Sequence, residues 1–75
     1  GTTTPLDIVN YQGKQFYLGW VCIRHNCGGN ELTFFISKDG KIAYGLVNST
    51  KMNIEDRFFG DPDSEVRKYL RDKMN

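Results

Sequence analysis

The residue types best suited to chemistry gather in one short segment of the chain. Cys22-Ile23-Arg24-His25-Asn26-Cys27 has both cysteines of the sequence at its ends and the only histidine between them. This spacing suits a local disulfide better than a metal site. If the cysteines pair, the ring contributes only about 2 kcal/mol through chain entropy. Rigidity of the loop is then a better reason for the disulfide than stability, because a rigid protruding segment loses little entropy when it docks to a partner.

Catalysis and metal binding are alternative uses of the same segment. Thiolate and imidazole are the donors that zinc prefers, so Cys22, His25 and Cys27 could ligate it. A structural zinc site takes four ligands, however, and the sequence has no further cysteine or histidine. A hydrolytic triad would have to be built from distant residues. We therefore predict no enzyme, no metal and no cofactor, and an exposed loop histidine beside a structural disulfide remains the simplest reading of His25.

Composition sets the broad class. The 75 residues are 39% hydrophobic and 13% aromatic, which is typical of one small folded domain over residues 1–75. A formal net charge of +1 gives no sign of a nucleic-acid partner. The longest apolar stretch, residues 16–23, is interrupted by Gly19 and too short to cross a bilayer. A disulfide would favour an oxidising, exported location.

Two hairpins are predicted to form one antiparallel sheet. Residues 6–11 and 15–22 flank a turn at Gly13, and residues 31–37 and 42–48 flank Asp39-Gly40, a type I′ turn signal. The period of two places Leu32, Phe34 and Ile36 on one face of their strand, and Ile42, Tyr44 and Leu46 on one face of theirs. The cysteine segment lies between the hairpins, so we expect it to project from a sheet end.

The remaining residues predict a loop, a short edge strand and a helix. Residues 49–56 are predicted to form the loop and residues 57–60 the strand. Trp20, in the earlier strand, is predicted to belong to the core. Asp61 is the expected N-cap of the helix, with Pro62 at its first position. Apolar residues at spacings of three and four mark its inner face: Val66, Tyr69, Leu70 and Met74. The fold class is α+β, with the C-terminal helix packed on one face of the sheet.

At the cysteine segment the chain resembles the Ivy family, the periplasmic bacterial inhibitors of vertebrate (c-type) lysozyme. Members carry a Cys-Lys-Pro-His-Asp-Cys loop followed by glycine, which Cys22, His25, Cys27 and Gly28 match in spacing. The likeness extends over residues 5–70. It includes Pro5, Val9, the Gly13 turn, an aromatic residue near position 16, Tyr44-Gly45-Leu46, and Phe59-Gly60-Asp61-Pro62 before the helix.

The resemblance implies a lysozyme inhibitor whose disulfide-closed loop inserts His25 into the enzyme cleft. It implies a c-type lysozyme or a related peptidoglycan hydrolase as partner and a periplasmic or otherwise exported location. Ile23, Arg24 and Asn26 stand where the family has Lys, Pro and Asp. An Ivy-like binding module that recognises another exported protein is therefore the alternative function. An uncovered sheet face also makes a homodimer possible.

Overall fold

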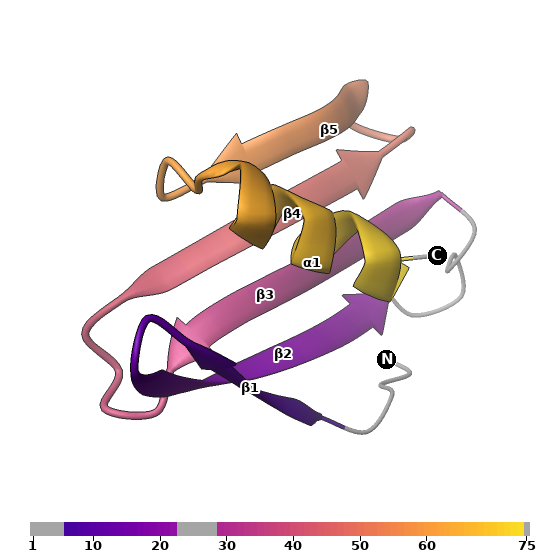
Figure 1. Cartoon of the computed structure of the whole chain (residues 1–75). Coiled ribbons are helices and arrows are strands. Elements are labelled where there is room, and N and C mark those ends of the chain that lie inside the picture. The colour runs from indigo at the N-terminus through magenta and orange to yellow at the C-terminus, as the bar shows by residue number, and fades with distance from the viewer. Residues whose placement is uncertain (1–5, 23–28, 75) are drawn as a thin grey trace.

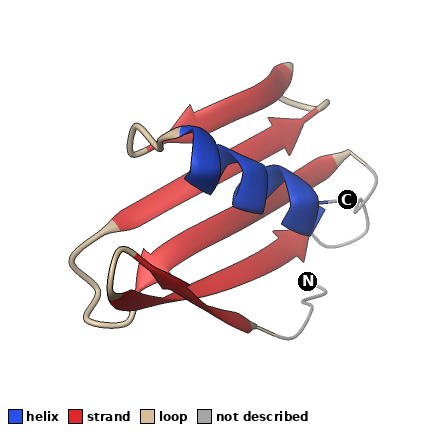
Figure 2. Cartoon of the chain, viewed as in Figure 1, coloured by secondary structure: helices blue, strands red, loops and turns tan. Residues whose placement is uncertain are grey.

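The computed structural model describes residues 6–22 and 29–74, which form one antiparallel sheet and one helix (Figure 1). The five strands are neighbours in chain order. Their bounds are Asp7–Tyr11 for β1, Lys14–Cys22 for β2, Asn30–Ser37 for β3, Ala43–Ser49 for β4 and Ile54–Phe59 for β5, and α1 spans Ser64–Met74. The predicted α+β class, with a C-terminal helix on one sheet face, is confirmed (Figure 2).

The two predicted hairpins are present, with the first turn at Gly13 as predicted and the second turn different from the expectation. Tyr11 pairs with Lys14, and the two residues between them, Gln12 and Gly13, both have positive φ. This is the arrangement of a type I′ turn. In the second hairpin only Gly40 has positive φ, so the predicted type I′ turn at Asp39-Gly40 is wrong. The longer connection there instead lets the Asp39 carboxylate accept bonds from Ser37 and Lys41.

The core lies between α1 and the three central strands, with Phe35 of β3 at its centre. Phe35 is fully buried, its ring stacks on Phe16 of β2 with centroids 4.4 Å apart, and the ring of Tyr69 lies 5.5 Å away. Val66 and Leu70 are fully buried on the helix side. The predicted inner face of the helix is therefore confirmed, with Tyr69 and Met74 packed at its border.

The two predicted apolar faces lie on opposite sides of the sheet. Tyr44 and Leu46 contribute to the core under α1. Phe35 pairs with Tyr44, so its neighbours Phe34 and Ile36 point to the side away from the helix. Periodicity identifies which residues share a face of a strand, but it does not say which face the helix covers.

The helix begins later than predicted, at Ser64 rather than Pro62. Asp63 is the capping residue, since its carboxylate accepts the N–H of Val66 at 2.9 Å. Asp61 was the predicted N-cap, but it has a left-handed φ of +57° directly after Gly60, which is also left-handed. Pro62 is buried at this turn. The chain uses two more residues to turn before the helix can start.

The last strand contains a bulge at Asp56. β5 begins at Ile54 and β4 ends at Ser49, so half of the predicted 49–56 loop is strand and a short turn joins the two strands. The pairing with β4 shifts register between Val47 and Ser49, and Asp56 has a φ of +48°. Asn48 accommodates the bulge from both sides: its amide donates to the Asp56 carboxylate at 3.1 Å and its carbonyl accepts the Asp56 N–H at 2.8 Å.

A tyrosine hydroxyl ties the first hairpin to the start of the helix. Tyr11 is buried and donates to the carboxylate of Asp63. This bond, with the Val66 N–H, holds the pKa of Asp63 below its usual value. The same bond, together with burial, raises the pKa of Tyr11 to about 12. The ionised Asp63 therefore stabilises the fold above the ordinary aspartate pKa, and this stability is lost as the pH falls through the lowered value.

We expect Tyr11→Phe to reduce stability at neutral pH and to matter less in acid. At pH 7 its melting temperature should lie about 5 °C below that of the parent. The gap should narrow below about pH 4, where Asp63 is protonated first in the unfolded chain, and also above about pH 10, where Tyr11 ionises first in the unfolded chain. Thermal melts followed by circular dichroism from pH 2.5 to 11 measure this gap, and a gap that stays constant would contradict the coupling.

Candidate functional site

The candidate site is the sheet end where β2 finishes and β3 starts. Cys22 is the last residue of β2; it is buried, with 5% of its surface exposed, and is paired in register with Glu31 of β3. The other predicted loop residues, Ile23, Arg24, His25, Asn26 and Cys27, lie outside the described residues. The pairing of the two cysteines and the inhibitory role of the loop therefore remain predictions. The described strands fix where this segment leaves and rejoins the sheet.

The start of β3 is bound to the turn between β4 and β5. The N–H of Thr50 donates to the carbonyl of Gly29 at 2.7 Å, and the Thr50 hydroxyl reaches the same oxygen at 3.3 Å. Beside it, the buried Ser49 hydroxyl donates to the side-chain oxygen of Asn30 and accepts the N–H of Met52 at 3.2 Å. Residues just after the predicted loop are thus anchored by backbone and side-chain bonds.

Trp20 and Glu31 form a second support at this end. The indole N–H of Trp20 donates to a carboxylate oxygen of Glu31 at 3.1 Å. Trp20 is half-buried rather than part of the central core, which corrects the prediction from its residue type. The bond holds Glu31 beside the strand pair that ends at Cys22.

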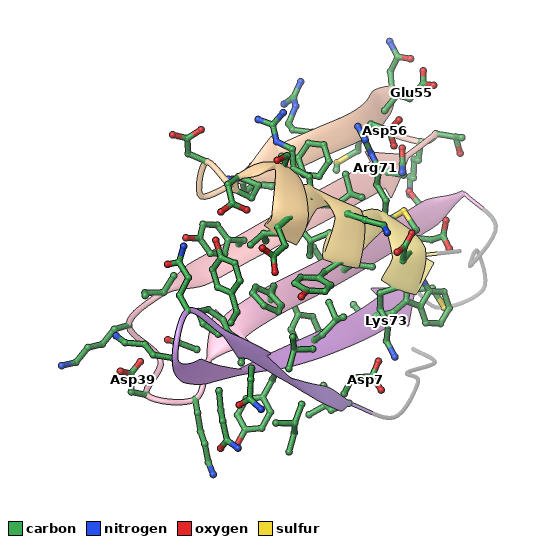
Figure 3. The ribbon with its side chains drawn as sticks, viewed as in Figure 1. Asp7, Asp39, Glu55, Asp56, Arg71 and Lys73 are labelled. Atoms are coloured by element: carbon green, nitrogen blue, oxygen red, sulfur yellow. The ribbon has the colours of Figure 1, made fainter. Side chains whose placement is uncertain are left out.

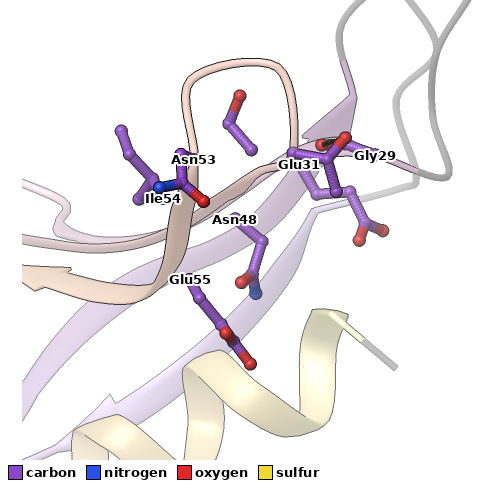
Figure 4. Close-up of a pocket in the computed structure, with 8 residues that line it drawn as sticks. Gly29, Glu31, Asn48, Asn53, Ile54 and Glu55 are labelled. Atoms are coloured by element: carbon purple, nitrogen blue, oxygen red, sulfur yellow. Dashed lines mark hydrogen bonds between the residues drawn. The ribbon is translucent and has the colours of Figure 1, made fainter.

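A polar cavity of about 320 Å³ opens next to these strand ends (Figure 4). Apart from Gly29 and Ile54, the lining residues carry amides, hydroxyls and two carboxylates, and none of them is basic. The lining residues are Gly29, Glu31, Asn48, Ser49, Thr50, Asn53, Ile54 and Glu55. The cavity offers hydrogen-bond acceptors and negative charge to any group that reaches it from outside. Nothing in the sequence indicates this cavity beyond a polar run that reads as an ordinary loop.

Charged side chains continue from this cavity toward the helix. Figure 3 shows Glu55, Asp56 and Arg71 together at this end of the molecule, whereas Asp39 lies at the opposite end of the sheet. Arg71 and Arg67 lie over the ring of Phe58, with the guanidinium carbons 5.2 and 5.1 Å from its centre. The basic side of the helix therefore packs partly on β5 through cation–π contacts.

Across residues 6–22 and 29–74, no three side chains of the metal-binding types lie close enough to hold an ion. In the same part of the chain, no helix has the length and apolar character to span a bilayer.

Comparison with known proteins agrees with the resemblance seen in the sequence. The chain is 29% identical to an uncharacterised protein of Pseudomonas aeruginosa, in an alignment that covers 99% of this chain and 54% of that protein. It thus spans about half the length of this relative. A family model described as inhibitor of vertebrate lysozyme (Ivy) matches residues 1–70. Because this match takes in nearly the whole sequence, the chain belongs to the Ivy family.

Proposed function

We propose that this chain inhibits a lysozyme by placing His25 in the active-site cleft of the enzyme on a loop closed by Cys22 and Cys27. The observation that carries the proposal is the family match, which includes the whole loop. The chain is not an enzyme, because the family is one of inhibitors. The anchoring at Cys22, Gly29 and Asn30 supports the proposal, since both strands that bear the loop are held at one sheet end.

The chemistry of a lysozyme cleft suits an imidazole. These enzymes use two carboxyl groups, one kept protonated by apolar surroundings and one ionised. Between them, the imidazole of His25 donates a hydrogen bond to the carboxylate and exchanges another with the acid, according to its protonation. Substrate is excluded because the loop occupies its place. The acidic cavity beside the loop, with Glu31 and Glu55, would face the basic surface of such an enzyme.

The finer features of this function are part of the same proposal. We propose that the chain is a single domain and acts in the periplasm or another exported location. Its expected partner is a c-type lysozyme or, failing that, a related peptidoglycan hydrolase. The alternative is an Ivy-like binding module that does not inhibit lysozyme. Arg24 and Asn26 favour that alternative, because they remove a rigid proline before His25 and an anion after it.

Lysis of a peptidoglycan suspension tests the proposal directly. Lysozymes of the c, g and i types are each assayed with and without the chain, and inhibition of the c type is the expected result. Lys41→Ala serves as a control, because this exposed residue lies in the β3–β4 turn at the other end of the sheet. Titration calorimetry that detects no binding to any of the three classes would replace the proposal with the alternative.

The disulfide is expected to act on binding more than on folding. No cysteine in the described part of the chain is free. In Cys22→Ala/Cys27→Ala the loop loses its closure, so inhibition should weaken about tenfold or more through the cost of ordering the loop on docking. The free energy of unfolding should fall by no more than about 2 kcal/mol, because the ring is small. Urea unfolding and the lysis assay measure the two effects, and a variant that does not fold would show that the bond is structural.

A further inference from the structure

Two buried polar side chains meet at the sheet end that carries the predicted loop. Asn30 begins β3, Ser49 ends β4, and the two residues are register partners. Each has only 2% of its surface exposed. The hydroxyl of Ser49 donates to the side-chain oxygen of Asn30 and accepts the N–H of Met52 at 3.2 Å. One hydroxyl therefore joins the start of β3 to the turn between β4 and β5.

Backbone bonds carry this connection one residue closer to the predicted loop. Gly29 lies two positions after Cys27, and its carbonyl accepts the N–H of Thr50 at 2.7 Å. The hydroxyl of Thr50 reaches the same oxygen at 3.3 Å, although the two residues are 21 positions apart in the sequence. The chain that returns from the predicted loop is thus bound to the β4–β5 turn before it enters the sheet.

A serine at the other end of β3 shows what a turn requires by itself. Ser37 is the last residue of β3 and is also 2% exposed. Its hydroxyl donates to the Asp39 carboxylate at 2.6 Å and accepts the N–H of Ile42 at 2.9 Å. Both partners belong to residues 38–42, the connection that follows Ser37 directly. Ser49 differs because its hydroxyl donates across to another strand, at the residue where β3 starts.

The Asn30–Ser49 pair is better suited to fixing a position than to adding stability. A buried amide or hydroxyl loses its bonds to water, so the net gain from pairing the two groups is small. An apolar pair of similar shape would stabilise a fold about as well. A hydrogen bond has a preferred distance and angle, however, whereas an apolar contact tolerates sliding. The pair therefore holds the start of β3 at one place on the end of β4.

We propose that Asn30 and Ser49 are positioning residues for inhibition, which fix the point where the loop re-enters the sheet and so fix how His25 is presented. This inference rests on the proposed function, in which the loop binds the cleft of the enzyme. On the exit side, the loop leaves from Cys22, which is buried and paired in register with Glu31. When both ends of a loop are held, less conformational entropy is lost as it docks.

Matched serine variants test the inference in the lysis assay. Ser49→Ala should raise the inhibition constant for a c-type lysozyme about tenfold, because ordering the loop on docking then loses more entropy. Ser37→Ala removes an equally buried hydroxyl and should lower the urea midpoint of unfolding by a similar amount. Its inhibition constant should nevertheless stay within about twofold of the parent, because Ser37 is distant from the loop. Equal inhibition constants for the two variants would overturn the inference.

A double-mutant cycle checks that the two residues act as a pair. Asn30→Ala should raise the inhibition constant about as much as Ser49→Ala does. Asn30→Ala/Ser49→Ala should raise it little further, because either change alone already removes the bond between the side chains. Single effects that multiply in the double variant would show that the residues act separately, and this would contradict the proposed pairing.

NMR on the free chain separates failure of this inference from failure of the proposed function. The heteronuclear NOE reports the rigidity of each backbone N–H on the ps–ns timescale. Without lysozyme, Ser49→Ala should lower the NOE of residues 23–28, and Ser37→Ala should not. If the parent inhibits no lysozyme and this difference is seen, the proposed function is wrong and the positioning of the segment is supported. If the NOE values in the parent and Ser49→Ala are the same, the positioning is overturned even when the parent inhibits.

Discussion

His25→Ala should reduce inhibition of a c-type lysozyme about thirtyfold and leave the fold intact. A side chain that fills the centre of an interface and is fully desolvated there typically costs 2 kcal/mol or more when it is truncated. The same side chain should contribute little to the fold, because the core is built by other residues such as Phe16, Phe35 and Leu70. Inhibition constants from the lysis assay and thermal melts measure the two quantities.

The outcome that would contradict this prediction is equal inhibition by parent and variant at sub-saturating dose. Arg24→Ala is the matched control, because it shortens a side chain in the same loop without removing the imidazole. If both variants lose inhibition equally, the loop acts by its general shape and charge. A loss of inhibition confined to His25→Ala supports the proposal that the imidazole occupies the active-site cleft.

Phe35→Ala should bring the protein close to the midpoint of its unfolding equilibrium at room temperature. Removing a buried phenylalanine ring costs about 3–5 kcal/mol, and a chain of this length has a total stability at the low end of about 5–15 kcal/mol. Phe35 is fully buried and stacks with Phe16 and Tyr69, so no neighbour can fill the space without leaving its own contacts. Urea unfolding followed by circular dichroism measures the loss.

Phe34→Ala is the matched control for this prediction, since it removes the same ring one residue earlier in the same strand. Phe34 lies on the face of the sheet opposite α1 and is only partly buried. At about 2 µM protein, where association does not contribute, Phe34→Ala should lower the free energy of unfolding by less than half as much as Phe35→Ala. Equal losses in the free energy of unfolding for the two variants would show that the sheet face opposite α1 stabilises a single chain as much as the helix side does.

Strand order and helix position could be predicted because the signals for them are local. The turns near Gly13 and Gly40 and the apolar spacing of Val66 and Leu70 each depend on a few adjacent residues. The helix start could not be predicted as well, because Asp61 and Asp63 are both suitable caps. The choice between them depends on the left-handed turn at residues 60 and 61 and on the distant Tyr11 hydroxyl.

The candidate site was predictable only in part for the same reason. The close spacing of Cys22, His25 and Cys27 is a short-range pattern, and it places the candidate loop directly after β2. The cavity beside it spans three strands, from Glu31 of β3 across β4 to Glu55 of β5, and lies next to the bulge at Asp56. No local pattern in the sequence predicts this arrangement. The apolar character of the sheet face opposite α1 could be predicted from the alternation along β3. Its exposure depends on which face of the sheet the helix covers.

The bulge in β5 also limits how copies of this protein can assemble. A regular edge strand presents an even row of N–H and C=O groups, to which further strands can add without end, and fibrils grow in this way. At Asp56 the backbone leaves the extended conformation, and the register with β4 is broken. A bulge bends and twists the strand, so a second chain cannot continue the row. The other edge, β1, has only five residues. Growth along the hydrogen-bonding direction is therefore disfavoured at both edges of the described sheet.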